Sequence, residues 1–198
     1  MNKRVLFACE SSELGKAAML KRGIDAHSCD LKPGELGLPN HHQCDVREIL
    51  NDGWYMLIGF PDCTRLTNSG VRWLHERNLW KELEEAAEFF NLLLNCDIPL
   101  KGLENPIHHK YARAFIRKYD QIIQPYYFGD MESKATCLWL EGLPPLMAQY
   151  SGGEGIKQSV HLEPPGPNRK ENRSRSFPGI MEAMAKQWGD YLLQGENK

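Results

Sequence analysis

The chain has 198 residues, of which 41% are hydrophobic and 25% are charged, and its formal net charge is −2. These values are ordinary for one soluble globular domain with a sizeable core, and they exclude a global positive field that would attract nucleic acid or membranes. The sequence has no apolar run of about 18 residues and no apolar signal core. We therefore expect a cytoplasmic protein that does not enter membranes, with one domain over residues 1–198.

Short apolar runs alternate with amphipathic segments over the first two thirds of the chain. The apolar runs predict strands at residues 4–9, 25–29, 44–46, 55–60 and 100–104. The segments between them predict helices at residues 13–22, 47–50, 76–96 and 108–118. Such alternation is typical of a mostly parallel sheet with helices on both faces.

The last third of the chain has a different pattern. Two predicted strands, residues 122–128 and 136–140, lie close together and indicate an antiparallel edge of the sheet. Residues 151–175 are rich in Gly, Pro and polar residues, which predicts a loop-rich insert with a short strand at 159–162. A closing helix is predicted over 180–193, with its buried side formed by Ile180, Met184, Trp188 and Tyr191.

Residues capable of chemistry stand where predicted strands end. Asp30 and Asp45 follow early strands, Cys63 follows the strand at 55–60, and Glu104-Asn105-Pro106 ends the strand at 100–104. In open α/β sheets the carboxyl ends of the strands form the ligand-binding edge. Carboxylates at such places also cap helices, and a cysteine there can be a buried structural thiol. Of the six cysteines, Cys63 stands out because Gly, Pro and Asp surround it.

The order of several short motifs resembles that of cytosine-C5 DNA methyltransferases. More narrowly, the chain is similar to short phage- and prophage-encoded methyltransferase-like proteins that lack a target-recognition domain. The motifs are Phe7-Ala-Cys-Glu, Ser-Cys-Asp30-Leu, Cys-Asp45-Val, Phe-Pro-Asp-Cys63, Glu104-Asn-Pro, Lys134-Ala-Thr-Cys-Leu-Trp-Leu140 and Glu171-Asn-Arg173-Ser-Arg175. The resemblance implies a class I methyltransferase (Rossmann-like) α/β fold.

The resemblance also implies a catalytic set. Cys63 would add to C6 of the pyrimidine, which makes C5 nucleophilic enough to accept a methyl group. Glu104 would bind the ring N3 and the exocyclic group. Arg173, with Arg175 as second candidate, would hold the pyrimidine carbonyl and phosphate through a planar guanidinium. The implied substrate-binding residues are Asn68, Ser69 and Asn105.

S-adenosylmethionine is the methyl donor that the resemblance implies. Phe7 would stack on its adenine, Asp30 would accept the ribose hydroxyls, and Asp45 would accept the adenine amino group. The full set of implied cofactor-binding residues is Phe7, Glu10, Asp30, Leu31, Asp45, Val46 and Pro61.

Three departures from the family pattern leave alternatives open. Asp62 precedes the cysteine where the family usually has Pro, the first loop carries Glu10 and Glu13 in place of glycines, and no target-recognition domain separates Arg175 from the closing helix. The leading hypothesis is an enzyme that methylates DNA cytosine with low sequence specificity. The alternatives are an enzyme that modifies a free pyrimidine nucleotide or uses another one-carbon donor, and a non-catalytic phage protein that binds DNA or a partner.

Local charge favours a nucleic-acid or nucleotide ligand. Arg65, Arg72 and Arg77 follow the Cys63 loop, with Trp73 and Trp80 beside them, and basic residues recur between 157 and 175. Basic residues interleaved with aromatic residues suit a single strand or a lone nucleotide, although a solvated charged loop has the same composition. His41-His42, Cys44 and His108-His109 are the only zinc-ligand candidates, and their spacing is not finger-like, so we predict no metal.

Overall fold

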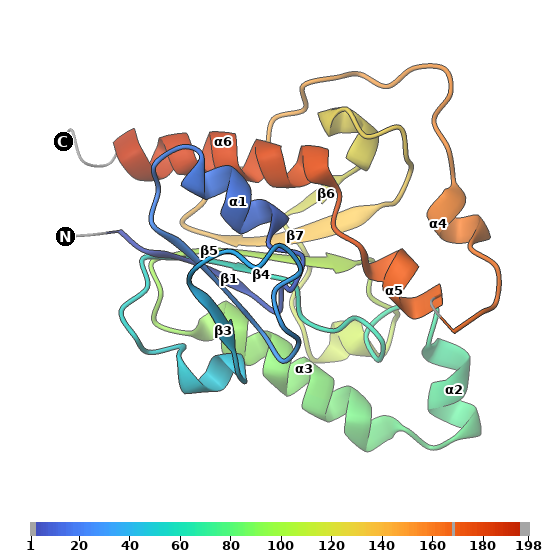
Figure 1. The fold of residues 1–198 in the computed structure, drawn as a ribbon. Coiled ribbons are helices and arrows are strands. Elements are labelled where there is room, and N and C mark those ends of the chain that lie inside the picture. The colour runs from blue at the N-terminus through green and yellow to red at the C-terminus, as the bar shows by residue number, and fades with distance from the viewer. Residues whose placement is uncertain (1–2, 168, 195–198) are drawn as a thin grey trace.

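The computed structural model describes residues 3–167 and 169–194, and they are built around a seven-stranded sheet (Figure 1). The strand order is β3-β2-β1-β4-β5-β7-β6, and every pairing is parallel except the two that β7 makes. The strands are β1 (Val5–Ala8), β2 (Ala26–Asp30), β3 (His41–Gln43), β4 (Met56–Gly59), β5 (Leu100–Pro106), β6 (Gln121–Ile123) and β7 (Thr136–Glu141).

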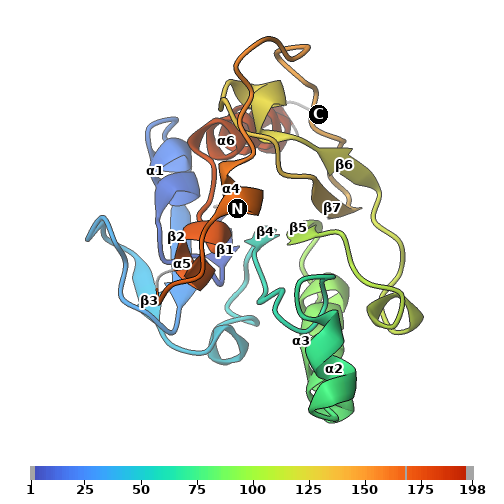
Figure 2. The same ribbon diagram turned by 90° about the vertical axis from the view of Figure 1, so that its right-hand side faces the viewer.

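Helices cover both faces of the sheet. Figures 1 and 2 show α1 and α6 on one face and α3 on the other. The α-helices are α1 (Leu14–Leu20), α2 (Val71–Glu76), α3 (Trp80–Asn95), α4 (Ser159–Leu162), α5 (Arg169–Ser174) and α6 (Pro178–Gln194). Short 3₁₀ turns are η1 (Val46–Glu48), η2 (Ala112–Ala114) and η3 (Pro125–Phe128). The predicted mostly parallel α/β sheet, with helices on both faces and an antiparallel C-terminal edge, is confirmed.

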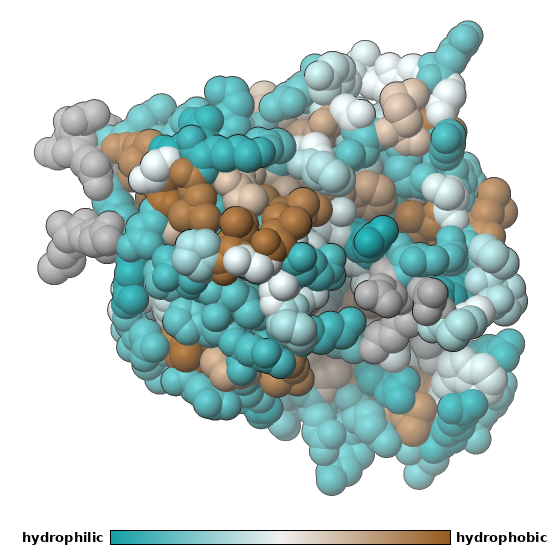
Figure 3. Space-filling view, viewed as in Figure 1, coloured by the Kyte–Doolittle hydropathy of each residue, from teal (hydrophilic) through white to brown (hydrophobic). Residues whose placement is uncertain are grey.

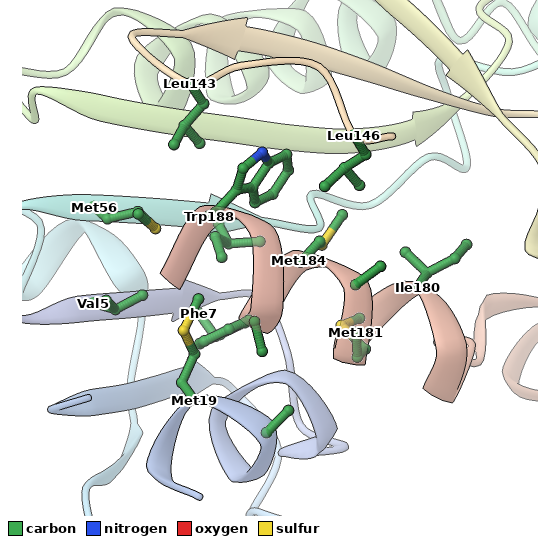
Figure 4. Close-up of a cluster of buried hydrophobic side chains, with 14 of the residues drawn as sticks. Val5, Phe7, Met19, Met56, Leu143, Leu146, Ile180, Met181, Met184 and Trp188 are labelled. Atoms are coloured by element: carbon green, nitrogen blue, oxygen red, sulfur yellow. The ribbon is translucent and has the colours of Figure 1, made fainter. Parts of the chain in front are cut away.

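Two apolar clusters hold the layers together. On one face, Met184 and Trp188 of α6 pack with Phe7 of β1, and all three are fully buried (Figure 4). On the other face, Phe90 of α3 packs edge-on against Trp139 of β7, with ring centroids 4.9 Å apart. Both clusters follow the helical and alternating spacing of apolar residues in the sequence.

The two sides of the sheet also differ in the hydropathy of the surface above them. In the view of Figure 1, apolar side chains gather where α1 and α6 lie, and the helix α3 is covered mainly by hydrophilic side chains (Figure 3). None of the helices among residues 3–167 and 169–194 has the length and apolar content needed to cross a lipid bilayer.

Several predicted elements were wrong in their limits. The helix predicted over 76–96 begins later, at Trp80 of α3, because Asn78 adopts a left-handed conformation (φ 52°) between α2 and α3, and α2 lies in a segment for which no helix was predicted. The segment 44–46 is not a strand, and its neighbours His41 and His42 form β3 instead of a turn. Within 108–118 the only helical part is the three-residue η2.

The C-terminal third contains further corrections. The strand predicted over 122–128 ends at Ile123, because Pro125 cannot donate to a sheet ladder and begins η3. The strand predicted at 159–162 is the helix α4, and α5 lies inside the predicted loop-rich insert. Tyr191 was predicted on the buried side of the last helix but is 44% exposed.

Candidate active site

The loop that carries Cys63 follows β4 and is tightly folded. The backbone N–H groups of Leu66 and Thr67 donate to the Cys63 carbonyl at 3.0 and 3.2 Å. The Asn105 amide donates to the Pro61 carbonyl at 2.8 Å, which ties the loop to the end of β5. Cys63 itself is partly exposed. The sequence therefore places a thiol on a rigid turn at the carboxyl edge of the sheet.

Asn105 and His108 hold this turn in place through hydrogen bonds. Asn105 uses its amide nitrogen for Pro61, so its Oδ1 accepts a hydrogen bond from His108 Nε2 at 3.1 Å. Burial, followed by the neighbouring His109, lowers the pKa of His108 to about 4, so the ring is neutral. Asn105 is only 1% exposed. The predicted contact with substrate has no support in this arrangement, because both ends of its amide are hydrogen-bonded inside the protein.

Glu104 lies one residue before Asn105 on β5 and is partly buried. Burial raises the pKa of its carboxyl, and Lys134 and a hydrogen bond from the Thr136 hydroxyl oppose that effect. The pKa of Cys63 is also raised, by burial first and then by Asp62 and Glu104, and Lys134 again opposes the shift. The Lys134 ammonium thus favours ionisation of both Cys63 and Glu104, and the Glu104 carboxylate opposes ionisation of Cys63.

A small pocket lies beside Glu104, with a volume of about 20 Å³, which holds roughly one water molecule. It opens between the sheet edge and the segment that leads into α6. Its lining consists of Phe60, Glu104, Lys134, Thr136, Ser174, Arg175, Ser176, Phe177, Ile180 and Met181.

The pocket distinguishes the two predicted arginines. Arg175 lines it together with Glu104, whereas Arg173 is not part of the lining. The backbone carbonyl of Arg173 accepts a hydrogen bond from Lys134 Nζ at 3.1 Å, and the same ammonium lies 5.5 Å from the Phe177 ring centroid. Sequence reasoning overlooked Lys134 and Thr136 as site residues. Thr136 begins β7, the strand that pairs with β5, and Lys134 lies two residues before it.

The ends of β1, β2 and β3 form the other half of the same edge. Burial raises the pKa of the Cys9 thiol to about 12, and Asp30, Asp45 and Asp62 add to the shift, which places these three carboxylates around Cys9. Asp30 accepts the Lys32 N–H at 2.9 Å. The structure therefore brings the predicted donor-binding aspartates together.

Asp45 has a partner of its own. Its carboxylate caps η1 by accepting the backbone N–H of Arg47 at 3.0 Å and also accepts Arg47 Nε at 2.9 Å. These hydrogen bonds lower its pKa to about 2. Asp45 is consequently an ionised acceptor at neutral pH.

The first loop is closed by buried charges. Glu13 and Lys16 are both fully buried and their side chains are 2.5 Å apart. Glu13 also accepts the backbone N–H of Leu36 at 2.7 Å, and Lys16 donates to the Pro39 carbonyl at 3.0 Å. Burial opposes ionisation of Glu13, but the hydrogen bonds from Lys16, Leu38 and Leu36 outweigh it and lower its pKa. The ion pair fixes residues 34–39 against the loop.

Glu10 sits inside the same loop and is 3% exposed. Ser12 donates to its Oε1, whereas its Oε2 has no hydrogen-bond partner among the described residues. Burial raises its pKa to about 7. An unpartnered buried carboxylate oxygen is unusual in a native fold and is suited to accept a donor group from a ligand.

Other predicted residues lie in contrasting surroundings. Phe7 is fully buried under Gly15, so the predicted stacking of its ring on adenine has no support in this arrangement. Val46 and Pro61 are also buried, and Leu31 is 72% exposed beside Asp30. The predicted substrate residues Asn68 and Ser69 are exposed in the Cys63 loop.

Across residues 3–167 and 169–194 no three His, Cys, Asp or Glu residues form a group that could hold a metal.

Neither a family model nor a curated protein matches this sequence. Among solved structures, an E. coli protein described as a DNA modification methyltransferase encoded within a prophage has a TM-score of 0.45 and 17% identity, over 70% of this chain and 46% of its own length. The Entamoeba histolytica methyltransferase EhMeth has a TM-score of 0.47 and 13% identity, over 77% and 58%. The S. pombe Dnmt2 methyltransferase has a TM-score of 0.45 and 16% identity, over 95% and 66%.

Proposed function

We propose that the chain is a transferase that methylates C5 of cytosine in DNA with low sequence specificity. The observation that carries this proposal is the meeting of Cys63 and Glu104 at neighbouring strand ends, where the Lys134 ammonium acts on both. A non-catalytic binding protein has little use for a thiol and a carboxylic acid arranged around one cation. Arg175 adds a guanidinium on the same pocket wall as Glu104.

The reaction follows from these groups. The Cys63 thiolate would form a bond to C6 of the pyrimidine while Glu104, whose pKa is raised by burial, gives a proton to N3. The electron pair that this places at C5 would form the new bond to the methyl carbon, as the bond between methyl and the donor's sulfur breaks and its electron pair stays on that sulfur. Water would then take the C5 proton, N3 would return its proton to Glu104, and Cys63 would leave as a thiolate, which restores the ring. Lys134 and Arg175 would stabilise the oxygen at C2 and a neighbouring phosphate.

The ends of β1, β2 and β3 fit a cationic nucleoside donor. S-adenosylmethionine, when bound, supplies an electrophilic methyl group on a positively charged sulfur. Asp30 and Asp45 offer acceptors for ribose hydroxyls and an adenine amino group, and the unpartnered Oε2 of Glu10 offers one for an ammonium group. Phe7 is excluded from this set by its burial.

A covalent trap tests the proposal. With S-adenosylmethionine present, a single-stranded oligonucleotide with 5-fluoro-deoxycytidine should form an adduct with the wild-type protein that resists denaturation, because after methyl transfer the fluorine at C5 cannot leave as a proton does. Cys63→Ser should abolish the adduct. Glu104→Gln should slow its formation by roughly 10²-fold or more, since the proton at N3 is lost. Failure of the wild-type protein to form any adduct would refute the enzymatic assignment on DNA.

A free pyrimidine nucleotide as substrate, or another one-carbon donor, is the second candidate. The first loop favours it, because the Glu13–Lys16 pair and residues 34–39 occupy space where glycines would let a cofactor approach the backbone. An adduct on 5-fluoro-deoxycytidine monophosphate without one on the oligonucleotide would select the nucleotide. Calorimetry that detects no binding of S-adenosylmethionine by the wild-type protein would select another donor.

A further inference from the structure

The helix α2 stands immediately beside the candidate nucleophile. Two hydrogen-bonded turns join it to the Cys63 loop, through Gly70 N to the Thr67 carbonyl and Trp73 N to the Gly70 carbonyl, both at 3.1 Å. Figure 1 shows α2 on the same side of the molecule as α4 and α5, and Figure 2 views that side directly. On this side of the molecule α2 therefore follows the Cys63 loop directly.

We define the α2 surface as Arg65, Arg72, Trp73, Arg77 and Lys110. Arg72 and Arg77 are exposed, and their guanidinium carbons lie 4.1 and 4.2 Å from the Trp73 ring centroid. Lys110 lies 4.8 Å from the centroid of Tyr111. Each of these three cations is therefore oriented by an aromatic ring that is itself part of the fold.

The rings of Tyr111, His75 and Trp80 hold one another in place. The Tyr111 hydroxyl and His75 Nε2 are 3.0 Å apart, and Trp80 meets both rings edge-on with centroids 5.0 to 5.2 Å away. Asn78, in its left-handed conformation, turns the chain so that α2 and α3 place these rings together. The α2 surface is thus a preformed array of cations and rings.

These cations are not neutralised by carboxylates. Within the described part of the chain, no ion pair involves Arg65, Arg72, Arg77 or Lys110, whereas Lys81 pairs with Glu85 and Arg117 with Asp120. The whole chain carries a net charge of −2. A local excess of unpaired positive charge in an overall acidic protein indicates an anionic partner at this place.

We propose that the α2 surface binds single-stranded DNA that flanks the pyrimidine held at Cys63 and Glu104. Phosphates would pair with the arginines and Lys110 of the α2 surface. Unpaired bases would stack on the group formed by Trp73 and the guanidinium planes of Arg72 and Arg77. A single strand is favoured over a duplex because α2 has only six residues and is too short to read a major groove. This inference rests on the proposed function and makes the substrate a polymer, not a free nucleotide.

The double variant Arg72→Gln/Arg77→Gln tests the proposal. Its binding to a labelled, unmodified single strand of about 12 nucleotides would be measured by fluorescence anisotropy at salt concentrations from about 50 to 200 mM. The plot of log affinity against log salt should become shallower by about 1.4, because each lost phosphate contact removes about 0.7. Affinity at the lowest salt should fall about tenfold, regardless of sequence.

The matched control is Lys21→Gln/Lys186→Gln, which removes two exposed cations from α1 and α6. It should bind the strand like the wild-type protein, and circular dichroism should show that both double variants are folded. An unchanged salt slope in the α2 variant, or an equal loss in the control, would overturn the proposal. Weak wild-type binding that is insensitive to salt would also overturn it and favour a protein partner.

The outcome is separable from that of the covalent trap. The binding assay uses an oligonucleotide without fluorine, so it reports on the α2 surface even if Cys63 forms no adduct. Conversely, an adduct that wild-type and Arg72→Gln/Arg77→Gln proteins form at the same rate on the oligonucleotide would retain the enzyme and eliminate the α2 surface as its strand-binding site.

Discussion

The carboxyl edge of the sheet has two halves that differ in construction. The pyrimidine half, at the ends of β4, β5 and β7, brings Cys63, Glu104 and Lys134 together from distant parts of the sequence. The donor half, at the ends of β1, β2 and β3, is assembled from residues 9–45 and sealed by the buried Glu13–Lys16 pair. Cys63 in the first half is partly exposed and Lys134 opposes the effect of burial there, whereas the second half holds Glu10, whose Oε2 has no hydrogen-bond partner among the described residues. The pyrimidine half is therefore suited to chemistry, and the donor half to holding a cation.

The buried pair should be the donor half's largest single contribution to stability. Lys16→Met leaves the Glu13 carboxylate buried without its counter-charge, and we expect a loss of about 3 to 5 kcal/mol in the free energy of unfolding. Urea denaturation followed by circular dichroism measures it. Cys63 should keep its reactivity toward iodoacetamide under native conditions, because the two halves share no hydrogen bond through this pair.

The control for that variant is Glu13→Gln/Lys16→Met. Glutamine still accepts the Leu36 N–H but carries no charge, so the double variant should lose less stability than Lys16→Met alone. An equal or larger loss in the double variant would show that side-chain packing, and not the unpaired charge, explains the effect.

Glu10 gives the donor half a pH dependence. Its pKa is raised by burial from 4.5 to about 7, so the folded protein holds this proton between those values while the unfolded chain releases it. Stability is then complete below pH 4.5 and falls as the pH rises through 7. Glu10→Gln should remove this loss, worth about 3 kcal/mol by the linkage relation. Parallel pH dependence of unfolding in both proteins would contradict the assignment.

Asn105 tests the support of the pyrimidine half. Asn105→Ala leaves the Pro61 carbonyl and the His108 Nε2–H without partners, and we expect a loss of about 1 to 3 kcal/mol. The Cys63 loop should also open more often, so that iodoacetamide modifies Cys63 faster at constant pH. Asn91→Ala is the matched control, because its amide also bonds a carbonyl, that of Phe115, but lies away from this loop. A Cys63 rate unchanged by Asn105→Ala would contradict the supporting role.

The sequence could predict the sheet and the strand ends because both depend on local patterns. Apolar runs located β1, β2 and β4, and the ends of β2 and β4 located Asp30 and Cys63. It could not show that Asn78 divides α2 from α3, since a left-handed asparagine is set by its surroundings. Lys134 was missed for the same reason: its role depends on β7 pairing with β5, a contact between segments remote in the chain.

Burial depth was equally beyond the sequence. Phe7 and Asn105 belong to short motifs whose spacing is compatible with ligand contact, yet the packing of Gly15 over Phe7 and the bond from Asn105 to Pro61 place both inside the protein. Lys16 is a fully buried lysine that composition alone would assign to the surface.

Substitution of Asp62 tests the difference between the two halves with the smallest expected effect. Burial raises the pKa of Cys63, and the Asp62 carboxylate adds to that shift, so the pyrimidine half carries a neighbour that weakens its own nucleophile. Asp62 Oδ1 accepts the Thr64 N–H at 2.6 Å, a bond that asparagine can keep. Asp62→Asn should therefore preserve the turn and raise the alkylation rate of Cys63 at pH 7 by roughly two- to fivefold, the size expected for a surface charge. Peptide mass spectrometry can follow Cys96 in the same sample as an internal reference. Equal acceleration at both cysteines would signal loosened structure, whereas acceleration at Cys63 alone would show that a charge at the edge of the site, and not burial alone, sets its reactivity.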